Sequence, residues 1–370
     1  ERSGEGPAPV QVFTRSMIEE LGAASIPDVL RYTPQQPFTR AEHYYNSGAQ
    51  YSQMRGIGVD TTLILINGRR VAPTSNSLTL NGFDLNSIPL AAVDRIEVLS
   101  DSASAIYGAD AMGGVINVVL KKDIPRPVLD MQYGGASGGA DLLRTSFSAG
   151  YDTERLRTTV IFDYYERDFL LGSERDLWRD QDYSRHGGLD YRSMAGVPGT
   201  VSSLHGDNLP GLSSSFAMVP EGSRGLGLTP QDFAATAGMR NRTSTLSTLS
   251  IVPQAKQRSL ALFGEYDVTP DLVAFAEVLY TNRQTISQEG LYPVQSALVP
   301  ANNPFNPFQQ PVLVDFILDG IEPRRFEHDM NWLRGAFGLR GSLSSAWQWE
   351  VAALASTESG DARSTIEVSA

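Results

Sequence analysis

The sequence predicts a small α+β domain followed by antiparallel strands of a transmembrane β-barrel, and three observations carry this prediction. Residues 94–120 read as a strand, a short helix, a glycine turn and a second strand. From Val128 onward, long segments alternate apolar and polar residues, which is the period of strands whose two faces differ. Short connections between these segments alternate with long polar ones, as in barrels with short turns at one end and long loops at the other.

The composition excludes several classes of protein. The chain has 370 residues, a net charge of −12 and no cysteine. The absence of cysteine excludes disulfides and thiolate metal sites, and the acidic balance argues against nucleic-acid binding, which needs a basic face. No run reaches the ~18 apolar residues of a spanning helix. The strands of an outer-membrane barrel contain no such runs either, because polar residues facing the lumen alternate with apolar residues facing lipid.

The first domain is expected to cover residues 10–123. Residues 1–9 are rich in glycine and proline and are predicted to be a flexible leader. A short alternating strand over 10–14 precedes two short helices, for which Ser16 and Ser25 are the predicted N-caps.

The centre of this domain carries two further strands. Residues 61–66 form an apolar run rich in branched side chains, which fits a strand buried on both faces. The following pair, Asn67-Gly68, is a strong signal for a tight hairpin turn. Residues 93–99 then return as a strand.

A short helix and a last strand complete the domain. Residues 103–107 are predicted to be helical, with Gly108 as a left-handed stop. Gly113 and Gly114 allow a tight entry into a strand over 115–120, because glycine tolerates backbone conformations that other residues avoid.

Residues 124–370 are predicted to be the N-terminal part of a transmembrane β-barrel, with long external loops near 169–257 and 289–328. The clearest alternating segments are 142–151, 156–167, 259–268, 272–288, 330–343 and 347–359. The side chains expected to face lipid in the central pair of strands are Leu260, Leu262, Tyr266, Ala274, Val278 and Tyr280. Those expected to face the lumen, where charge costs little, are Glu265, Asp267 and Glu277.

The number of strands is too small to close a barrel around the first domain. Roughly seven strands fit the pattern, and seven would close into a cylinder only ~14 Å across. A domain of ~120 residues has a diameter of about 35 Å. About 22 strands would leave ~44 Å between opposite backbones, enough for a plugged lumen. The chain is therefore expected to be an N-terminal portion of a barrel of ~22 strands.

Four motifs in the first domain occur in a characteristic order. They are Arg55-Gly56, the segment from Leu65 to Val71, the tetrapeptide Arg95-Ile96-Glu97-Val98, and the run from Ser104 to Asn117. In this order they resemble the plug domain of TonB-dependent outer-membrane receptors, over roughly residues 10–123. The chain departs from the family pattern in the stretch 99–102, where a usual glycine is replaced.

The resemblance implies a location in the bacterial outer membrane and a role in transport. In this family, external loops bind a small-molecule or oligosaccharide ligand, and periplasmic TonB with its ExbB–ExbD motor pulls on a segment near the N-terminus. The implied function is import of a scarce solute, such as a siderophore, a vitamin or a glycan. The alternative is an outer-membrane surface receptor or sensor that binds ligand and signals without importing it.

Plug-motif and gating candidates follow residue by residue from the resemblance. They are Arg55, Gly56, Asn67, Gly68, Arg69, Arg95, Glu97, Tyr107, Gly108, Gly113, Gly114 and Asn117. The resemblance further implies that Arg55, Arg95 and Glu97 form ion pairs that help to seat the plug against the barrel wall. The alternative is that they are ordinary ion pairs inside the plug.

The candidates for ligand binding are aromatic and amide side chains of the external loops, because aromatic rings can stack on sugars or on aromatic chelates. They are Trp178, Tyr183, Tyr191, Asn303, Phe305 and Phe308. Packing within the loops would equally account for the aromatic residues. The four histidines are scattered and show no zinc-ligand spacing, so neither a metal nor a cofactor is expected. The sequence carries no catalytic motif, so an enzyme is not expected.

Overall fold

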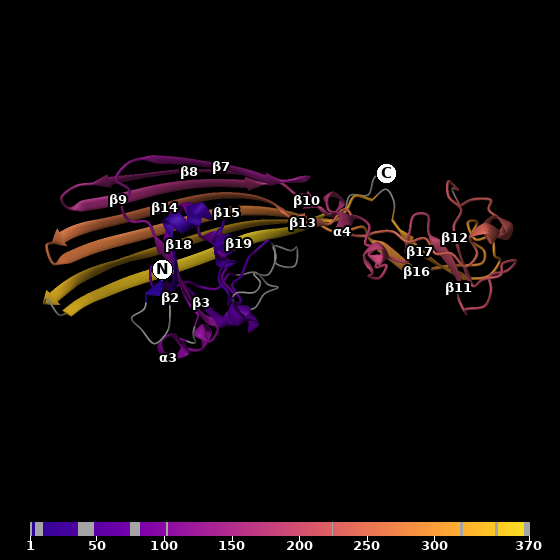
Figure 1. Ribbon diagram of the computed structural model, residues 1–370, viewed down its shortest axis with the longest axis horizontal. Helices are drawn as coiled ribbons and strands as arrows, with labels where there is room; N and C mark the ends of the chain where they lie inside the picture. The colour runs from indigo at the N-terminus through magenta and orange to yellow at the C-terminus, as the bar shows by residue number, and fades with distance from the viewer. Residues whose placement is uncertain are drawn as a thin grey trace.

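The computed structural model describes residues 2–3, 10–35, 48–74, 82–100, 103–223, 225–318, 321–344 and 347–365. In it, the N-terminal residues form a compact plug on the concave side of a curved β-sheet, which we call the wall (Figure 1). At one end of the wall, the long loops fold into a separate external unit (Figure 1). No helix among these residues is both long enough and apolar enough to cross a membrane.

The plug is built on a mixed six-stranded sheet in the order β1-β2-β5-β6-β3-β4. The strands are β1 Arg2–Ser3, β2 Val10–Thr14, β3 Thr62–Ile66, β4 Arg69–Arg70, β5 Val93–Leu99 and β6 Gly114–Leu120. Only β3 and β6 run parallel, and all five residues of β3 are buried, as its apolar sequence predicts. Part of the expected leader thus forms an edge strand, while residues 1 and 4–9 lie outside the described residues.

Short helices and turns join these strands. They are α1 Arg15–Glu20, α2 Ile26–Leu30 and α3 Ser104–Tyr107, with 3-10 turns at Met54–Gly56, Val59–Thr61, Leu85–Ser87, Leu90–Ala92 and Ala109–Ala111. The prediction of Ser25 as an N-cap is confirmed, since its side chain accepts a hydrogen bond from the backbone of Asp28. The prediction of Ser16 is wrong, because Thr14 is the N-cap of α1. Gly108 has a positive φ of 82° but an extended ψ of −171°, so it is not a left-handed helix stop.

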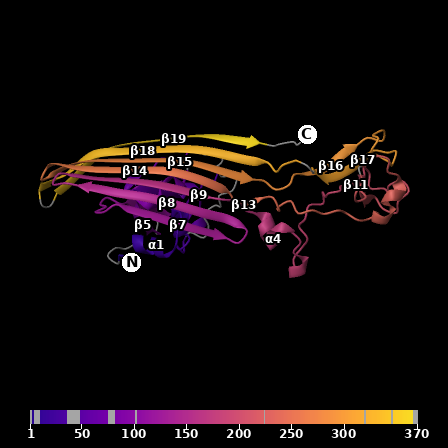
Figure 2. The same cartoon turned by 90° about the horizontal axis from the view of Figure 1, so that it is seen from above.

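The wall is a seven-stranded antiparallel sheet in the order β19-β18-β15-β14-β9-β8-β7, which Figure 2 shows from above. The strands are β7 Val128–Ala136, β8 Gly139–Asp152, β9 Leu156–Arg167, β14 Gln254–Thr269, β15 Leu272–Gln288, β18 Arg325–Ser344 and β19 Trp347–Thr365. The predicted bounds of β9 and β15 are confirmed. The predicted segments of β14, β18 and β19 are too short, because these strands continue beyond the apolar zone toward the external unit.

The convex face of the wall carries an apolar zone of the height that a membrane requires. On β18, Leu333, Phe337, Leu339 and Leu343 are all exposed on this face. About ten residues at ~3.4 Å per residue, tilted by ~40°, span ~25 Å, the usual height of the lipid-facing zone of an outer-membrane barrel.

The concave face of the wall packs directly against the plug. One apolar core contains plug residues such as Phe83 and wall residues such as Ala261 and Trp332. The rings of Phe83 and Trp332 meet edge to face with their centroids 5.6 Å apart. The plug is therefore seated on the lumen side of the sheet, as the sequence predicts.

The two long loops fold together rather than remaining separate. The external unit has a four-stranded sheet in the order β12-β11-β17-β16. Its strands are β11 Thr200–Ser203, β12 Phe216–Met218, β16 Pro293–Val299 and β17 Val312–Ile317, and the short strands β10 Leu170–Leu171 and β13 Ser250–Val252 pair at its base, next to α4 Asp176–Arg179. It has its own apolar core, which includes Val201, Phe233 and Phe308.

Candidate functional site

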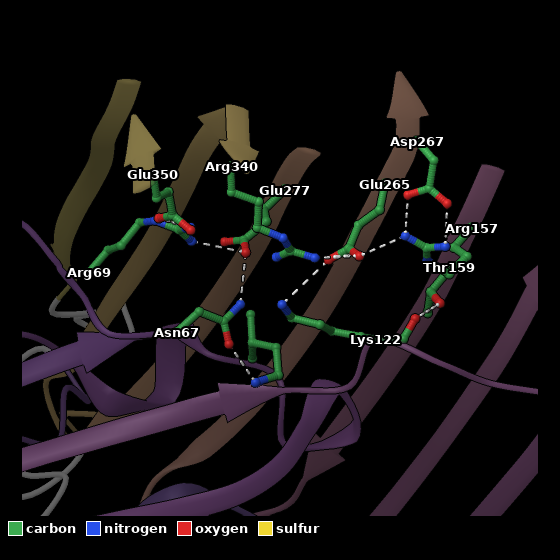
Figure 3. Close-up of polar contacts among 11 residues, drawn as sticks. Asn67, Arg69, Lys122, Arg157, Thr159, Glu265, Asp267, Glu277, Arg340 and Glu350 are labelled. Carbon is green, nitrogen blue, oxygen red and sulfur yellow. Dashed lines mark hydrogen bonds and ion pairs between the residues drawn. The ribbon is translucent and has the colours of Figure 1, made fainter. Parts of the chain in front are cut away.

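The tip of the β3–β4 hairpin touches the wall through Asn67. Its backbone has a φ of 50°, a left-handed conformation that asparagine tolerates better than most residues. The side-chain oxygen accepts a hydrogen bond from the backbone N–H of Leu120 at 2.9 Å, and the amide nitrogen donates to Glu277 of β15 at 2.9 Å (Figure 3). One side chain thus joins β6 of the plug to the wall.

Glu277 is the centre of a first charged cluster. Arg69 of the plug donates to the Glu277 carboxylate at 3.1 Å and to Glu350 of β19 at 2.6 Å (Figure 3). Arg334 of β18 lies 3.5 Å from the other oxygen of Glu277. The guanidinium of Arg69 also sits over the ring of Phe275, 4.6 Å from its centroid, which adds a cation–π contact.

Glu265 of β14 is the centre of a second cluster. Lys122, just after the last plug strand, lies 3.4 Å from its carboxylate (Figure 3). Two wall arginines share the same group, Arg340 at 2.6 Å and Arg157 at 3.5 Å. Thr159 donates to the backbone carbonyl of Lys122 at 2.7 Å, so the wall holds this segment by its main chain as well. Next to it, burial lowers the pKa of Lys121 to about 8.

A third set of contacts lies nearer the external end of the wall. Arg283 of β15 forms a buried ion pair with Asp84 of the plug at 2.8 Å. Arg144 of β8 holds Asp163 of β9 through two hydrogen bonds of 2.8 and 3.1 Å and also donates to the plug carbonyl of Ala24. Plug and wall are therefore joined by polar contacts along much of the wall strands.

Comparison with known proteins identifies the N-terminal domain. Residues 3–115 match the TonB-dependent receptor plug domain. Over 143 residues the chain is 34% identical to a vitamin B12 transporter, BtuB, of Photobacterium profundum, a stretch covering 39% of this chain and 22% of that protein. Residues 3–115 are a TonB-dependent receptor plug domain. A chain with this domain, followed by antiparallel barrel strands, is located in the bacterial outer membrane.

One solved structure agrees at the level of the fold. A mutant of the ferric enterobactin receptor PfeA from Pseudomonas aeruginosa matches with a TM-score of 0.50 at 14% identity, covering 95% of this chain and 45% of that one. The ferric preacinetobactin receptor BauA of Acinetobacter baumannii gives 0.47 at 15% identity, covering 97% and 48%. The chain thus spans less than half of these receptors, and the seven wall strands are part of a larger barrel.

Only part of the predicted TonB-dependent receptor motif faces the wall. Asn67 and Arg69 do so, through Glu277 and Glu350. Arg95 instead pairs with Glu97 at 2.8 Å and with Asp94 at 3.1 Å, inside the plug. The ion pairs of Arg95 and Glu97 that the structure describes thus lie inside the plug, as the alternative expects, and their role in seating the plug stays a prediction.

The remaining motif residues organise the plug itself. Arg55 donates to the carbonyl of Ser100, and Gly56 follows it in the same turn. The side chain of Asn117 accepts from the backbone of Gly68 and donates to Glu97, each at 2.9 Å. The carbonyl of Tyr107, next to Gly108, accepts from Arg70.

Gly113 and Gly114 lie where the chain enters β6. Gly114 has a φ of 144°, and an added Cβ would lie 2.6 Å from the carbonyl oxygen of Leu99. The predicted tight entry into β6 therefore depends on a glycine at this position.

Sequence reasoning missed several residues of the plug–wall contact, although a signal for them was present. Glu277 and Glu265 were expected to face the lumen. Charged residues at lumen-facing positions indicate a contact with the domain that fills the lumen. The arginines Arg283, Arg334 and Arg340 occupy equivalent inward positions on their strands. Their partners could not be named, because the docked face of the plug has no signature in the sequence.

The ligand-binding candidates have different environments in the external unit. Trp178 and Tyr191 are exposed, and the rings of Tyr183 and Tyr191 lie 5.9 Å apart. Phe305 is also exposed, and Asn303 accepts a hydrogen bond from its backbone. Phe308 is instead a core residue, with 3% of its surface exposed and its ring 5.1 Å from that of Phe233. Phe308 therefore packs within the loops and is not placed to contact a ligand.

Ion pairs fix the loop that carries these aromatic rings. Arg192 donates two hydrogen bonds to Asp190 and one to Asp182. Hydrogen bonding to Arg192 lowers the pKa of Asp190 to about 2. Among the described residues, no group of three or more potential ligands is placed to hold a metal ion.

We predict opposite roles for the two phenylalanines. Phe308→Ala should leave a cavity in the small core and cost about 3–5 kcal/mol, which would unfold the external unit locally. Phe305→Ala should leave the unit folded, because this residue is 56% exposed, and should reduce ligand affinity alone. Limited proteolysis of the external unit measures the first effect. Equal protease resistance of the two variants would contradict the assignment of Phe308 to the core.

Proposed function

We propose that this protein imports a scarce solute across the outer membrane and that the plug is the gate. The observation that supports it is the double attachment of the plug to inward carboxylates of the wall, at Glu277 through Asn67 and Arg69 and at Glu265 through Lys122. These contacts are hydrogen bonds and ion pairs without a covalent link. Such contacts can break and re-form without loss of the barrel, as a gate requires.

The solute we propose is a siderophore, a vitamin or a glycan that first binds the external unit. Exposed aromatic rings at Trp178, Tyr191 and Phe305 support a ligand with flat or ring-shaped groups, since such rings stack well. The names of two similar proteins, a vitamin B12 transporter and a ferric enterobactin receptor, fit this range of chemistry.

The energy is proposed to come from the inner membrane through TonB and its ExbB–ExbD motor. The start of the chain is well placed for such a force, because β1 and β2 form the edge of the plug sheet. β2 is held by pairing to β5 over five residues, so a pull on it acts first on one short strand.

Uptake by whole cells tests this proposal. A strain deleted for the full-length receptor is supplied with candidate solutes, and uptake is compared with the complemented strain and with a strain lacking TonB. We expect one solute whose uptake needs both proteins. A receptor that binds a solute and changes gene expression, with uptake unchanged by its deletion, would instead be a sensor that does not import.

A further inference from the structure

Each of two wall carboxylates that hold the plug also has a cationic partner on the wall itself. Glu277 is shared between Arg69 of the plug and Arg334 of the wall. Glu265 is shared between Lys122, which follows the last plug strand, β6, and the wall residues Arg340 and Arg157. The wall therefore contains a second cation at both of these attachment points.

Arg334 is poorly satisfied while the plug is seated. Its side chain is fully buried, with an exposed fraction of 0%, and its one ion pair within the described ranges is the long 3.5 Å contact to Glu277. Two of its nitrogens, Nε and Nη2, have no hydrogen-bond partner among the described residues. Arg69 occupies the better position on the same carboxylate, at 3.1 Å, together with Asn67 at 2.9 Å.

We infer that Arg334 is a positioning residue for gating, which takes over the Glu277 carboxylate when Arg69 withdraws with the plug. This inference rests on the proposed function, in which the plug moves. Burying a cation with unpaired donors raises the free energy of the seated state. After Arg69 has left, Arg334 can form a closer pair with Glu277, which lowers the free energy of the released state. Both effects make plug release faster.

At a third buried attachment point, no charged wall residue that the structure describes is placed to replace the partner on the plug. This point can therefore be compared with the Glu277 cluster. Arg283 makes its one ion pair within the described ranges with Asp84, which belongs to the plug. Release of the plug there separates two buried charges, and no described wall carboxylate is paired with Arg283 to take the place of Asp84. Replacing Arg283 therefore destabilises the seated state, because Asp84 loses this counter-charge, whereas replacing Arg334 relieves the seated state.

The two arginines are tested with one reporter in the full-length receptor. Ala261 of β14 is fully buried in the core shared by plug and wall, so a cysteine there reacts with a maleimide only after the plug has moved away. These 370 residues include no cysteine, and any cysteine elsewhere in the receptor is replaced. Labelling of Ala261→Cys is followed over time in purified receptor at a fixed, sub-denaturing urea concentration.

We expect Arg334→Met to slow labelling at least tenfold and Arg283→Met to accelerate it at least tenfold. Arg334→Lys should restore the rate to within threefold, since lysine can also pair with Glu277. Equal or faster labelling in Arg334→Met would overturn the inference, because loss of a merely structural arginine loosens the plug. If that variant does not fold into a heat-modifiable barrel, Arg334→Gln, which keeps polar donors but loses the charge, decides the question in the same way.

Failure of the proposed function would be recognised separately. The labelling assay needs neither a solute nor TonB, so its outcome stands whether or not the receptor imports anything. Absence of TonB-dependent uptake for every solute, with the opposite labelling effects intact, would reject import and keep the role of Arg334. TonB-dependent uptake that proceeds equally fast in Arg334→Met, together with unchanged labelling, would reject the role of Arg334 alone.

Discussion

Asp163→Asn is expected to destabilise the wall by about 3–5 kcal/mol, since it removes the charged partner of a buried arginine. The side chains of Arg144 and Asp163 are 7% and 2% exposed, and two hydrogen bonds of 2.8 and 3.1 Å join them. Asparagine would leave the guanidinium buried without this counter-charge. Arg144 also donates to Ala24, so the plug would lose an anchor at the same time.

A second pair in the same wall provides a matched control. Arg157 and Asp267 are joined by two hydrogen bonds of 2.9 and 2.8 Å, but their side chains are 30% and 27% exposed. Asp267→Asn should therefore have a much smaller effect, because water compensates the lost charge. Urea unfolding of the full-length receptor in detergent measures both variants. Similar losses of stability would show that burial does not set the strength of these pairs.

Gly114→Ala is expected to destabilise the plug by about 3 kcal/mol, through backbone strain and overpacking together. At a φ of 144°, the new Cβ would lie 2.6 Å from the carbonyl oxygen of Leu99 and 2.7 Å from the sulfur of Met54. The backbone atom cannot yield as a flexible side chain could, so β5 and β6 would have to separate at the point where they pair.

The variant Gly68→Ala tests the effect of backbone strain without the effect of steric crowding. Gly68 also has a positive φ, of 76°, but an added Cβ would meet nothing within 4 Å. It should cost only about 1 kcal/mol, the usual difference between glycine and alanine in this conformation. Hydrogen exchange of the backbone amides of β6 reports both effects. A Gly114→Ala plug as protected as the Gly68→Ala plug would contradict the crowding at Leu99.

The wall strands were predictable because a lipid-facing side and a lumen-facing side impose a strict two-residue period. β9 and β15 are the clearest cases, since short polar turns mark where they begin. The sheet of the external unit was not predictable in this way. Its strands are short, and β11 pairs with β17 more than 100 residues later in the sequence. Local patterns carry no information about such distant pairing.

The candidate site was likewise predictable only in part. The sequence indicates that Glu265 and Glu277 face inward, because position along a strand decides it. It does not indicate that Arg69 rather than Arg95 pairs with Glu277, because that depends on how the folded plug is docked. Arg95 lies close to Glu97 on the same strand, and this local ion pair does not require the plug to be docked against the wall.

The pairing of β11 with β17 has a consequence for the engineering of such receptors. The two strands come from loops that leave the wall at different hairpins, yet four residue pairs join them. A chimera that exchanges one of these loops alone would leave the other with unpaired main-chain groups. Transfer of recognition between receptors of this shape should therefore treat both loops as a single cassette.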